Sequence, residues 1–229
     1  MTNSLFAPPT LETKLSLTGL PGGGSKIQDR SPYAQPGAIT GATWKRLPSG
    51  LWYLDFDGID DVVTVGNGVS LRLVGAQTIK GWANLTAVGV DASAIYSRAG
   101  SGWATRNSML WADNAGGGLG RWGAHFPNGV NDWNQVVKNN SVVLNKWTQV
   151  VGTWDGISVA RLYLDGVLAN TNTYAITMTS DTSNYLIGSY GSAIYFKGGI
   201  ALVQAQSGVW SAIDVQNIFN REKQFFGVW

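Results

Sequence analysis

The sequence predicts an all-β fold in which two antiparallel sheets pack as a sandwich, with one short helix near the C-terminus. Two observations carry this prediction. Two β-prone runs are each closed by an Asp-Gly pair, at Asp155-Gly156 and Asp165-Gly166. Asp-Gly is the strongest short hairpin signal, because a type I′ turn needs positive φ at both central residues. Many further short β-prone runs alternate with turn residues, which is typical of a sandwich or barrel.

The composition fits one large β domain and excludes several classes of function. The chain has 229 residues, of which 44% are hydrophobic and 13% charged, with no cysteine. The charged share is about half of the usual one. A net charge of +2 without a basic run argues against nucleic-acid binding. We expect no disulfide, no signal peptide and no membrane span, since no run approaches the roughly 18 apolar residues that a span needs.

The chain divides into an N-terminal arm and one domain. Residues 1–25 are predicted to be an extended arm, because Pro8-Pro9 opposes regular ladder pairing and Pro21-Gly-Gly-Gly-Ser25 is a flexible joint. The arm either docks on a neighbouring subunit or packs along its own domain. Residues 26–229 are predicted to form the sandwich, which we expect to fold without the arm.

Short strands and one helix follow in order along residues 26–229. The run Gln77-Thr-Ile-Lys-Gly-Trp82 reads as an inner strand with Ile79 in the core. A helix is predicted after Ser211, which is a good N-cap with Asp214 as its capping-box partner. The apolar tail that follows either covers the sandwich or forms an interface. The expected strands are 51–57, 60–65, 77–85, 93–98, 107–113, 119–126, 146–154, 159–165, 173–178, 184–189 and 199–206.

Three motifs resemble one known family. They are Tyr53-Leu-Asp-Phe-Asp-Gly-Ile-Asp-Asp-Val-Val-Thr-Val65, the run from Trp147 to Trp154-Asp-Gly, and Leu162-Tyr-Leu-Asp-Gly166. Together they resemble the concanavalin A-like, laminin-G/pentraxin-type jelly roll. The resemblance implies a two-sheet antiparallel jelly-roll sandwich. It says less about function, because that fold carries lectins, adhesins, hydrolases and structural modules.

The residues for catalysis are missing from the predicted strands. Glycoside hydrolysis needs two carboxylates across the scissile bond, and the hydrolases of this family hold them on one strand as Glu-x-Asp-x-x-Glu. The two glutamates here, Glu12 and Glu222, lie in the arm and the helix. His125 is the only histidine, and no Gly-x-Ser-x-Gly elbow accompanies it. We expect no enzyme and no required cofactor.

Calcium is the metal that the resemblance implies. Family members often hold one ion through an opening-loop Asp, the "FDG" region and an acid of the last strand. Asp29, Asp57 and Asp60 match the first two parts, whereas the last strand reads Gly199-Ile-Ala-Leu-Val203 without an acid. Calcium takes six to eight oxygen ligands. A calcium site at these three residues therefore competes with a simpler interpretation, in which the carboxylates make turn hydrogen bonds.

The region 98–135 carries residues suited to sugars. Lectin sites stack the apolar face of a sugar on an aromatic ring and bind its hydroxyls with polar groups. The alternative is that the indole rings cap the core or fill subunit contacts. The candidate residues are Trp103, Arg106, Asn107, Trp122, Asn131, Asp132 and Trp133.

Two functions follow from these observations. The first is a non-enzymatic virion structural protein, namely a bacteriophage capsid decoration, head-fibre or tail component, because phage structural proteins commonly carry laminin-G-like modules. It would be assembled in the host cytoplasm and attached through residues 1–25 to other virion proteins or to its own copies, as a homo-oligomer. The alternative is a carbohydrate-binding module or adhesin that binds surface glycans through the Trp-rich loops.

Overall fold

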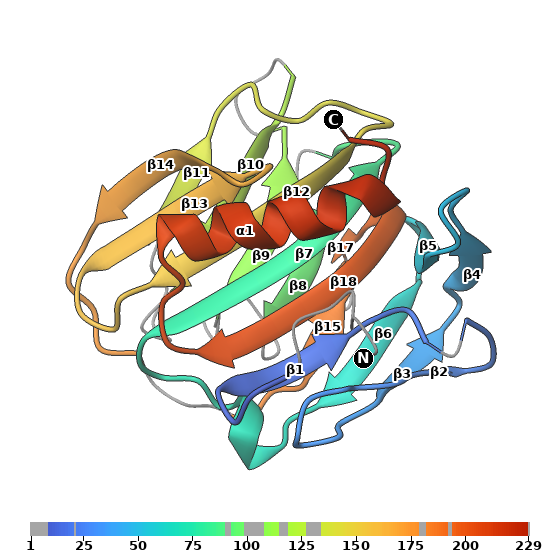
Figure 1. The fold of residues 1–229 in the computed structure, drawn as a ribbon, viewed down its shortest axis with the longest axis horizontal. Coiled ribbons are helices and arrows are strands. Elements are labelled where there is room, and N and C mark those ends of the chain that lie inside the picture. Colours follow the sequence, from blue (N-terminus) through green and yellow to red (C-terminus); the bar gives the residue numbers. More distant parts are fainter. Residues whose placement is uncertain are drawn as a thin grey trace.

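Two antiparallel sheets form the sandwich, as predicted (Figure 1). The computed structural model describes residues 9–20, 22–89, 93–98, 108–114, 119–126, 134–178, 182–191 and 194–228. Sheet A runs in the order β14-β13-β12-β7-β18-β5-β4, and β1 also pairs with β18. Its strands are β14 (Val167–Thr173), β13 (Val159–Leu164), β12 (Trp147–Trp154), β7 (Gln77–Leu85), β18 (Lys197–Ser207), β5 (Trp52–Asp57), β4 (Thr43–Arg46) and β1 (Thr13–Leu17).

Sheet B forms the second layer, in the order β11-β10-β9-β8-β15-β6-β3-β2. The additional pair β16 (Ser189–Tyr190) and β17 (Ile194–Tyr195) forms a small ribbon, and one 3-10 turn, η1, spans Val69–Leu71. The strands of sheet B are β11 (Gln135–Lys138), β10 (Arg121–His125), β9 (Met109–Asp113), β8 (Ser93–Arg98), β15 (Tyr185–Ile187), β6 (Val62–Gly66), β3 (Gly37–Thr40) and β2 (Lys26–Ile27).

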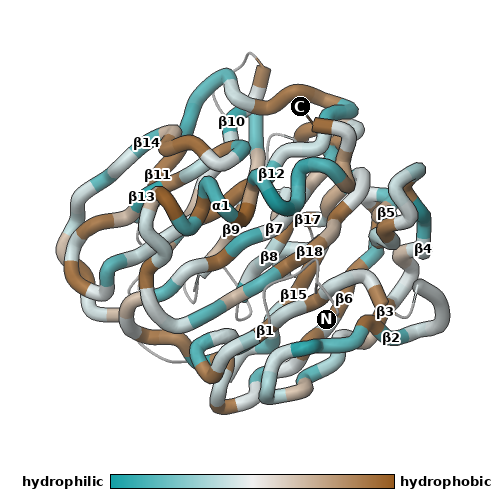
Figure 2. Tube along the Cα trace, viewed as in Figure 1, coloured by the Kyte–Doolittle hydropathy of each residue, from teal (hydrophilic) through white to brown (hydrophobic). Residues whose placement is uncertain are grey.

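The main core lies between the two sheets. Successive side chains of a strand point to opposite faces, so hydrophobic and hydrophilic residues are interleaved along the chain (Figure 2). Ile79 is fully buried in this core, as predicted, and Trp154 and Phe126 stack within it at a centroid distance of 6.3 Å. Large aromatic side chains therefore supply much of the buried apolar area that stabilises the sandwich.

The Asp-Gly signals gave one hairpin as expected and one with a longer turn. Asp165 and Gly166 have φ of 48° and 80°, the positive values that a type I′ turn requires. At Asp155-Gly156 only the glycine has positive φ, and the Asp155 carboxylate accepts hydrogen bonds from three backbone N–H groups of the turn. The prediction of a strand at 173–178 was wrong, because β14 starts directly after Gly166 and ends at Thr173.

Helix α1 (Ala212–Glu222) crosses the outer face of sheet A (Figure 1). The predicted capping box is present, with reciprocal hydrogen bonds between Ser211 and Asp214. A 3-10 turn, η3 (Lys223–Phe225), follows, and the tail then covers the sandwich, where Phe226 stacks on Trp82 at a centroid distance of 4.0 Å. No helix among the described residues is long and apolar enough to cross a membrane.

Part of the predicted arm is a strand of sheet A. Residues 13–17 form β1, which pairs antiparallel with β18 from Leu17↔Val203 to Thr13↔Gln206. Leu15 and Leu17 are 0% and 2% exposed and belong to the main core. This stretch therefore packs along its own domain, the second of the two alternatives above. A chain without residues 1–25 would lose β1 and two core leucines, so the structure leads us to expect a destabilised sandwich after that deletion.

Candidate functional site

Four strand ends of sheet B meet at one edge of that sheet. His125 at the end of β10 lies opposite Met109 at the start of β9 and Gln135 at the start of β11. β8 pairs antiparallel with β9 and ends at Arg98 on the same side. Residues 99–107 connect β8 to β9, and residues 127–133 connect β10 to β11. Both connections therefore start and end at this edge, which we call the loop edge of sheet B.

These two connections contain six of the seven predicted sugar-binding residues. Trp103, Arg106, Asn107, Asn131, Asp132 and Trp133 all lie outside the described residues. The strands on either side of the two connections are described, and they show that both connections are anchored at the same edge. The two groups of candidates are nevertheless some 25 residues apart in the sequence. The sequence alone did not establish that proximity.

Trp122, the seventh candidate, is a core residue. Its side chain is 1% exposed and belongs to the main core together with Ala124 two residues on. Because side chains alternate along a strand, Trp122 points inward while its neighbours Arg121 and Gly123 point outward. An indole ring enclosed by the core offers no face on which a sugar could stack, so Trp122 is removed from the predicted set.

The outer face of sheet B carries a charged pair that the sequence analysis did not select. Arg121 and Asp113, opposite each other on β10 and β9, form an ion pair with Nε–Oδ1 of 2.7 Å and Nη2–Oδ2 of 3.1 Å. The Arg121 guanidinium also lies 5.2 Å from the centroid of the Trp111 ring. Gly123 allows this packing, since a Cβ there would meet that ring at 2.5 Å. The sequence signal that could have predicted this ion pair is the presence of opposite charges at facing positions of a hairpin.

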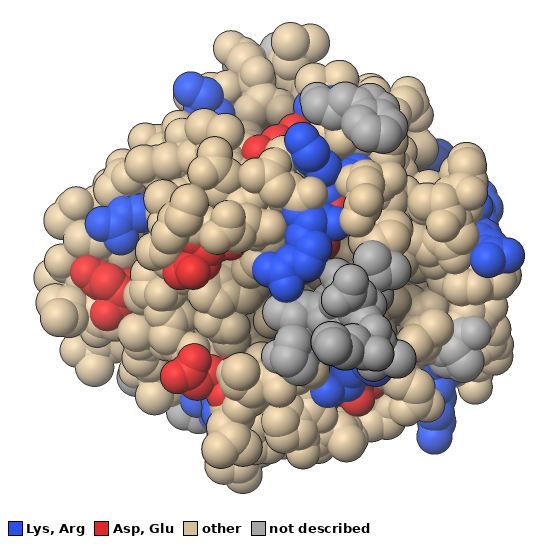
Figure 3. Space-filling view, viewed as in Figure 1, with Lys and Arg blue, Asp and Glu red and all other residues tan. Residues whose placement is uncertain are grey.

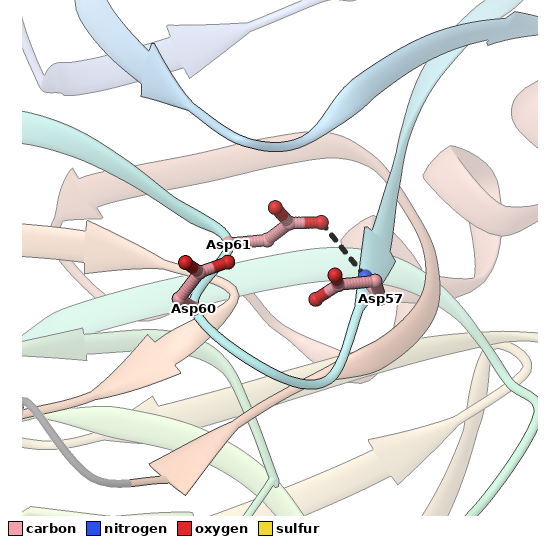
Figure 4. A group of neighbouring side chains, drawn as sticks. All are labelled: Asp57, Asp60 and Asp61. Carbon is pink, nitrogen blue, oxygen red and sulfur yellow. Dashed lines mark hydrogen bonds between the residues drawn. The ribbon is translucent and has the colours of Figure 1, made fainter.

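An acidic group lies between β5 and β6 (Figure 4). Asp57, Asp60 and Asp61 place one carboxylate oxygen each within 4.8 Å of one another. Asp61 Oδ2 accepts a hydrogen bond of 2.7 Å from the Asp57 backbone N–H. Burial raises the pKa of Asp61 above its ordinary value, and the charges of Asp57 and Asp60 raise it further. Crowded carboxylates of this kind suit a hard cation such as calcium.

Asp29, the third predicted calcium ligand, is not part of that group. Its Oδ1 accepts hydrogen bonds from the backbone N–H groups of Ser16 (2.8 Å) and Ser31 (2.9 Å). Its Oδ2 accepts from Ser31 Oγ (2.6 Å) and from the Gln35 backbone N–H (2.9 Å). Ser16 belongs to β1, so this carboxylate supplies an acceptor along the edge of that strand. These contacts fit the simpler turn-forming interpretation of Asp29, and Asp61 takes its place beside Asp57 and Asp60.

Neither glutamate stands on a strand. Glu12 lies in a turn before β1, and Glu222 is the last residue of α1. Glu222 is committed to a buried ion pair with Lys80 of β7, with a distance of 2.5 Å between Nζ and Oε1. Glu222 therefore helps to hold α1 on sheet A. His125, the only histidine in the sequence, lies on β10 and is 3% exposed.

Solved structures with this fold come from proteins of several kinds. Domain 4 of the extracellular arabinanase AbnA from Geobacillus stearothermophilus, solved with arabinotriose, is 14% identical at a TM-score of 0.69, with 90% of this chain and 98% of that chain covered. The botulinum neurotoxin serotype D binding domain is 13% identical at a TM-score of 0.67, with 92% and 52% covered. The Trypanosoma rangeli sialidase, solved with sialic acid, is 16% identical at a TM-score of 0.71, with 96% and 34% covered.

These similarities establish the fold alone. This chain spans about half of the neurotoxin binding domain and about a third of the sialidase. No curated protein shows significant similarity to it in sequence. The sequence profile of the concanavalin A-like lectin/glucanases superfamily, of the laminin-G type, matches residues 57–216, which is well over half of the chain. With its two-sheet sandwich and C-terminal helix, this chain belongs to the concanavalin A-like lectin/glucanases superfamily.

Proposed function

We propose that this protein is a non-enzymatic, lectin-like module that binds carbohydrate at the loop edge of sheet B. One observation carries the proposal. The register of β9 with β10, and of β10 with β11, anchors residues 99–107 and 127–133 at a single edge. Two sequence stretches that each combine an indole ring with amide or charged side chains therefore begin and end at the same edge of the sheet.

The residue types in these stretches match the chemistry of a sugar site. Trp103 and Trp133 can each stack on the apolar face of a sugar ring, and Arg106 and Asn107 can bind its hydroxyls. Asn131 and Asp132 add an amide and a carboxylate from the second connection. A site built from two connections of one edge can contact a sugar from two sides.

Similar structures support binding rather than catalysis. The arabinanase domain, which matches this chain over nearly its full length, was solved with a trisaccharide, and several similar chains are toxin binding domains. The sialidase matches over only a third of its length, so its activity gives no ground for expecting catalysis here. The positions of Glu12 and Glu222 off the strands further favour a module without hydrolase activity.

Glycan binding should be lost when the indole rings of the loop edge are removed. We expect Trp103→Ala and Trp133→Ala each to weaken binding of neutral glycans about tenfold or more, with little change in melting temperature, because one lost stacking contact is worth about 1–2 kcal/mol. An oligosaccharide array followed by calorimetric titration measures this. The matched control is Trp44→Ala on β4 of sheet A, which should leave binding unchanged. If the two loop variants instead lose several kcal/mol of folding stability, these are core residues and the proposal fails.

Calcium is proposed as an optional ligand of Asp57, Asp60 and Asp61. Millimolar calcium should raise the melting temperature by about 3–6 °C if its concentration is about ten times the Kd. The gain should vanish in Asp61→Asn and persist in Asp29→Asn. It should also fall as the pH drops through the raised pKa of Asp61, because the proton then competes with the cation. Differential scanning calorimetry with calcium or a chelator measures the effect, and an unchanged melting temperature would contradict the proposal.

A virion structural role stays a prediction from the sequence. The described part of the N-terminal segment includes β1, which is hydrogen-bonded into its own sheet. A deletion designed to test attachment through this segment therefore has to retain β1. The two functions are compatible, since a virion component with this fold could also hold a glycan.

A further inference from the structure

A groove of about 560 Å³ lies on the outer face of sheet A. Its floor is β18, with β1 on one side and α1 on the other, as the arrangement of these elements in Figure 1 makes clear. This volume falls within the range of about 300–1,000 Å³ that is usual for small-ligand sites. The groove faces away from sheet B and is therefore separate from the loop edge. Its lining includes Ser16, Lys80, Gln204, Gln206, Trp210 and Arg221.

Polar side chains form a row across the floor of this groove. The register places Ser16 of β1 opposite Gln204 of β18, and Gln204 opposite Lys80 of β7. All three residues line the groove. Because the backbone groups of these strands are paired within the sheet, the floor binds through side chains alone. That favours a ligand rich in hydroxyl groups over an extended peptide, which would need free backbone groups.

Several polar groups of the groove have no partner among the described residues. Thr18 is only 8% exposed, and its buried Oγ1 makes no hydrogen bond. The amide of Gln204 and the half-exposed guanidinium of Arg221 likewise have no described hydrogen-bond or ion-pair partner. Unpaired buried polar groups are uncommon in native proteins and call for a ligand or water. Gln204 and Arg221 are partly exposed and therefore leave hydrogen bonds open to a ligand in the groove.

Arg221 has no carboxylate partner among the described residues, although the acids Glu12 and Asp214 also line the groove. Lys80 and Glu222 neutralise each other in their buried pair, while Asp214, which accepts hydrogen bonds from Ser211, keeps its negative charge about two turns of α1 away from Arg221. Glu12 is exposed at the far rim. Figure 3 shows a column of positive side chains at the centre of this face, with acidic side chains beside it and further charged side chains towards the edges. A guanidinium binds a carboxylate through two parallel hydrogen bonds.

We propose that this groove binds an acidic oligosaccharide. Arg221 would hold a sugar carboxylate, the side chains of Gln204 and Ser16 would bind hydroxyls, and the half-buried ring of Trp210 would contact the apolar face of a sugar. The walls are preformed, because the Lys80–Glu222 pair fixes α1 on β7 and the hydrogen-bonded ladder fixes β1 on β18. This second site does not depend on the proposed site at the loop edge.

An oligosaccharide array with neutral members and members that contain uronic or sialic acid tests this proposal. The wild-type chain should retain acidic members, and Arg221→Gln should weaken that binding about tenfold or more, as loss of a charge-assisted pair does. Gln204→Leu should weaken the same members less, and added salt should weaken them in the wild type. Arg30→Gln, at an exposed arginine outside the groove, is the matched control and should change nothing.

The two sites are distinguished by crossing the variants. Trp103→Ala should leave the acidic members bound, and Arg221→Gln should leave neutral members bound at the loop edge. The groove proposal is overturned if the wild type retains no acidic member. It is also overturned if Arg221→Gln, with a wild-type melting temperature, retains acidic members with unchanged affinity. Failure of neutral binding alone would count only against the loop edge.

Discussion

Glu222→Ala is expected to lower the free energy of unfolding by about 3–5 kcal/mol, the usual cost of removing one partner of a buried ion pair. Glu222 Oε1 accepts from Lys80 Nζ at 2.5 Å, and Oε2 accepts from Trp82 Nε1 at 2.7 Å and from Gln149 Nε2 at 3.2 Å. Lys80 is 2% exposed. The substitution leaves a buried ammonium without its counter-charge and two further donors without an acceptor, so the melting temperature should fall by roughly 6–20 °C.

Two comparisons separate this cost from a general effect of losing a glutamate. Glu12→Ala removes the only other glutamate, which is exposed, and should change stability by less than about 0.5 kcal/mol. The double variant Lys80→Met with Glu222→Leu should recover much of the loss, because an apolar pair of similar volume often replaces a buried ion pair at little cost. Urea denaturation of the four proteins gives these values. A Glu222→Ala protein within about 1 kcal/mol of the wild type would contradict the expectation.

Local signals determined most of the fold. The Asp165-Gly166 turn, the inner strand around Ile79 and the capping box at Ser211 all depend on residues within a few positions of one another. A strand was expected at 173–178 because Tyr174, Ile176 and Met178 alternate with smaller residues, and these three side chains do face the core, but the segment forms no strand. β14 is exposed along most of its length, so its sequence Val-Leu-Ala-Asn-Thr-Asn-Thr carries little pattern of burial.

Long-range pairing could not be predicted from local sequence. Nothing within residues 13–17 indicates a partner at residues 203–206, nearly 190 positions further on. For the same reason the Lys80–Glu222 pair, separated by 142 positions, was not foreseen. The first feature adds a strand beside β18 with its leucines in the main core, and the second holds α1 on the outer face of sheet A, so both join elements that are far apart in the sequence. The groove lies between β1 and α1, so its position could not be predicted from local sequence either.

The candidate sugar site was predictable in its chemistry but not in its assembly. Residue types in the region 98–135 suggested sugar binding, and the register then brought the two connections to one edge. The alternation of side chains along β9 and β10 does not by itself tell which of Trp111 and Trp122 faces the core. The structure resolves this, since Trp122 packs between the sheets and Trp111 packs outside sheet B beneath Arg121.

Trp122→Ala is the second substitution with a large expected effect, about 3–5 kcal/mol of lost stability, as is usual when a buried tryptophan is truncated. The Trp122 side chain is 1% exposed, and its Nε1–H has no hydrogen-bond partner among the described residues. Trp122→Phe should therefore cost much less, below about 1.5 kcal/mol, because it keeps most of the apolar volume and removes an unsatisfied buried donor. Chemical denaturation measures both. Should Trp122→Ala keep wild-type stability while glycan binding disappears, Trp122 would be a ligand of the sugar after all, and its assignment to the core would have to be abandoned.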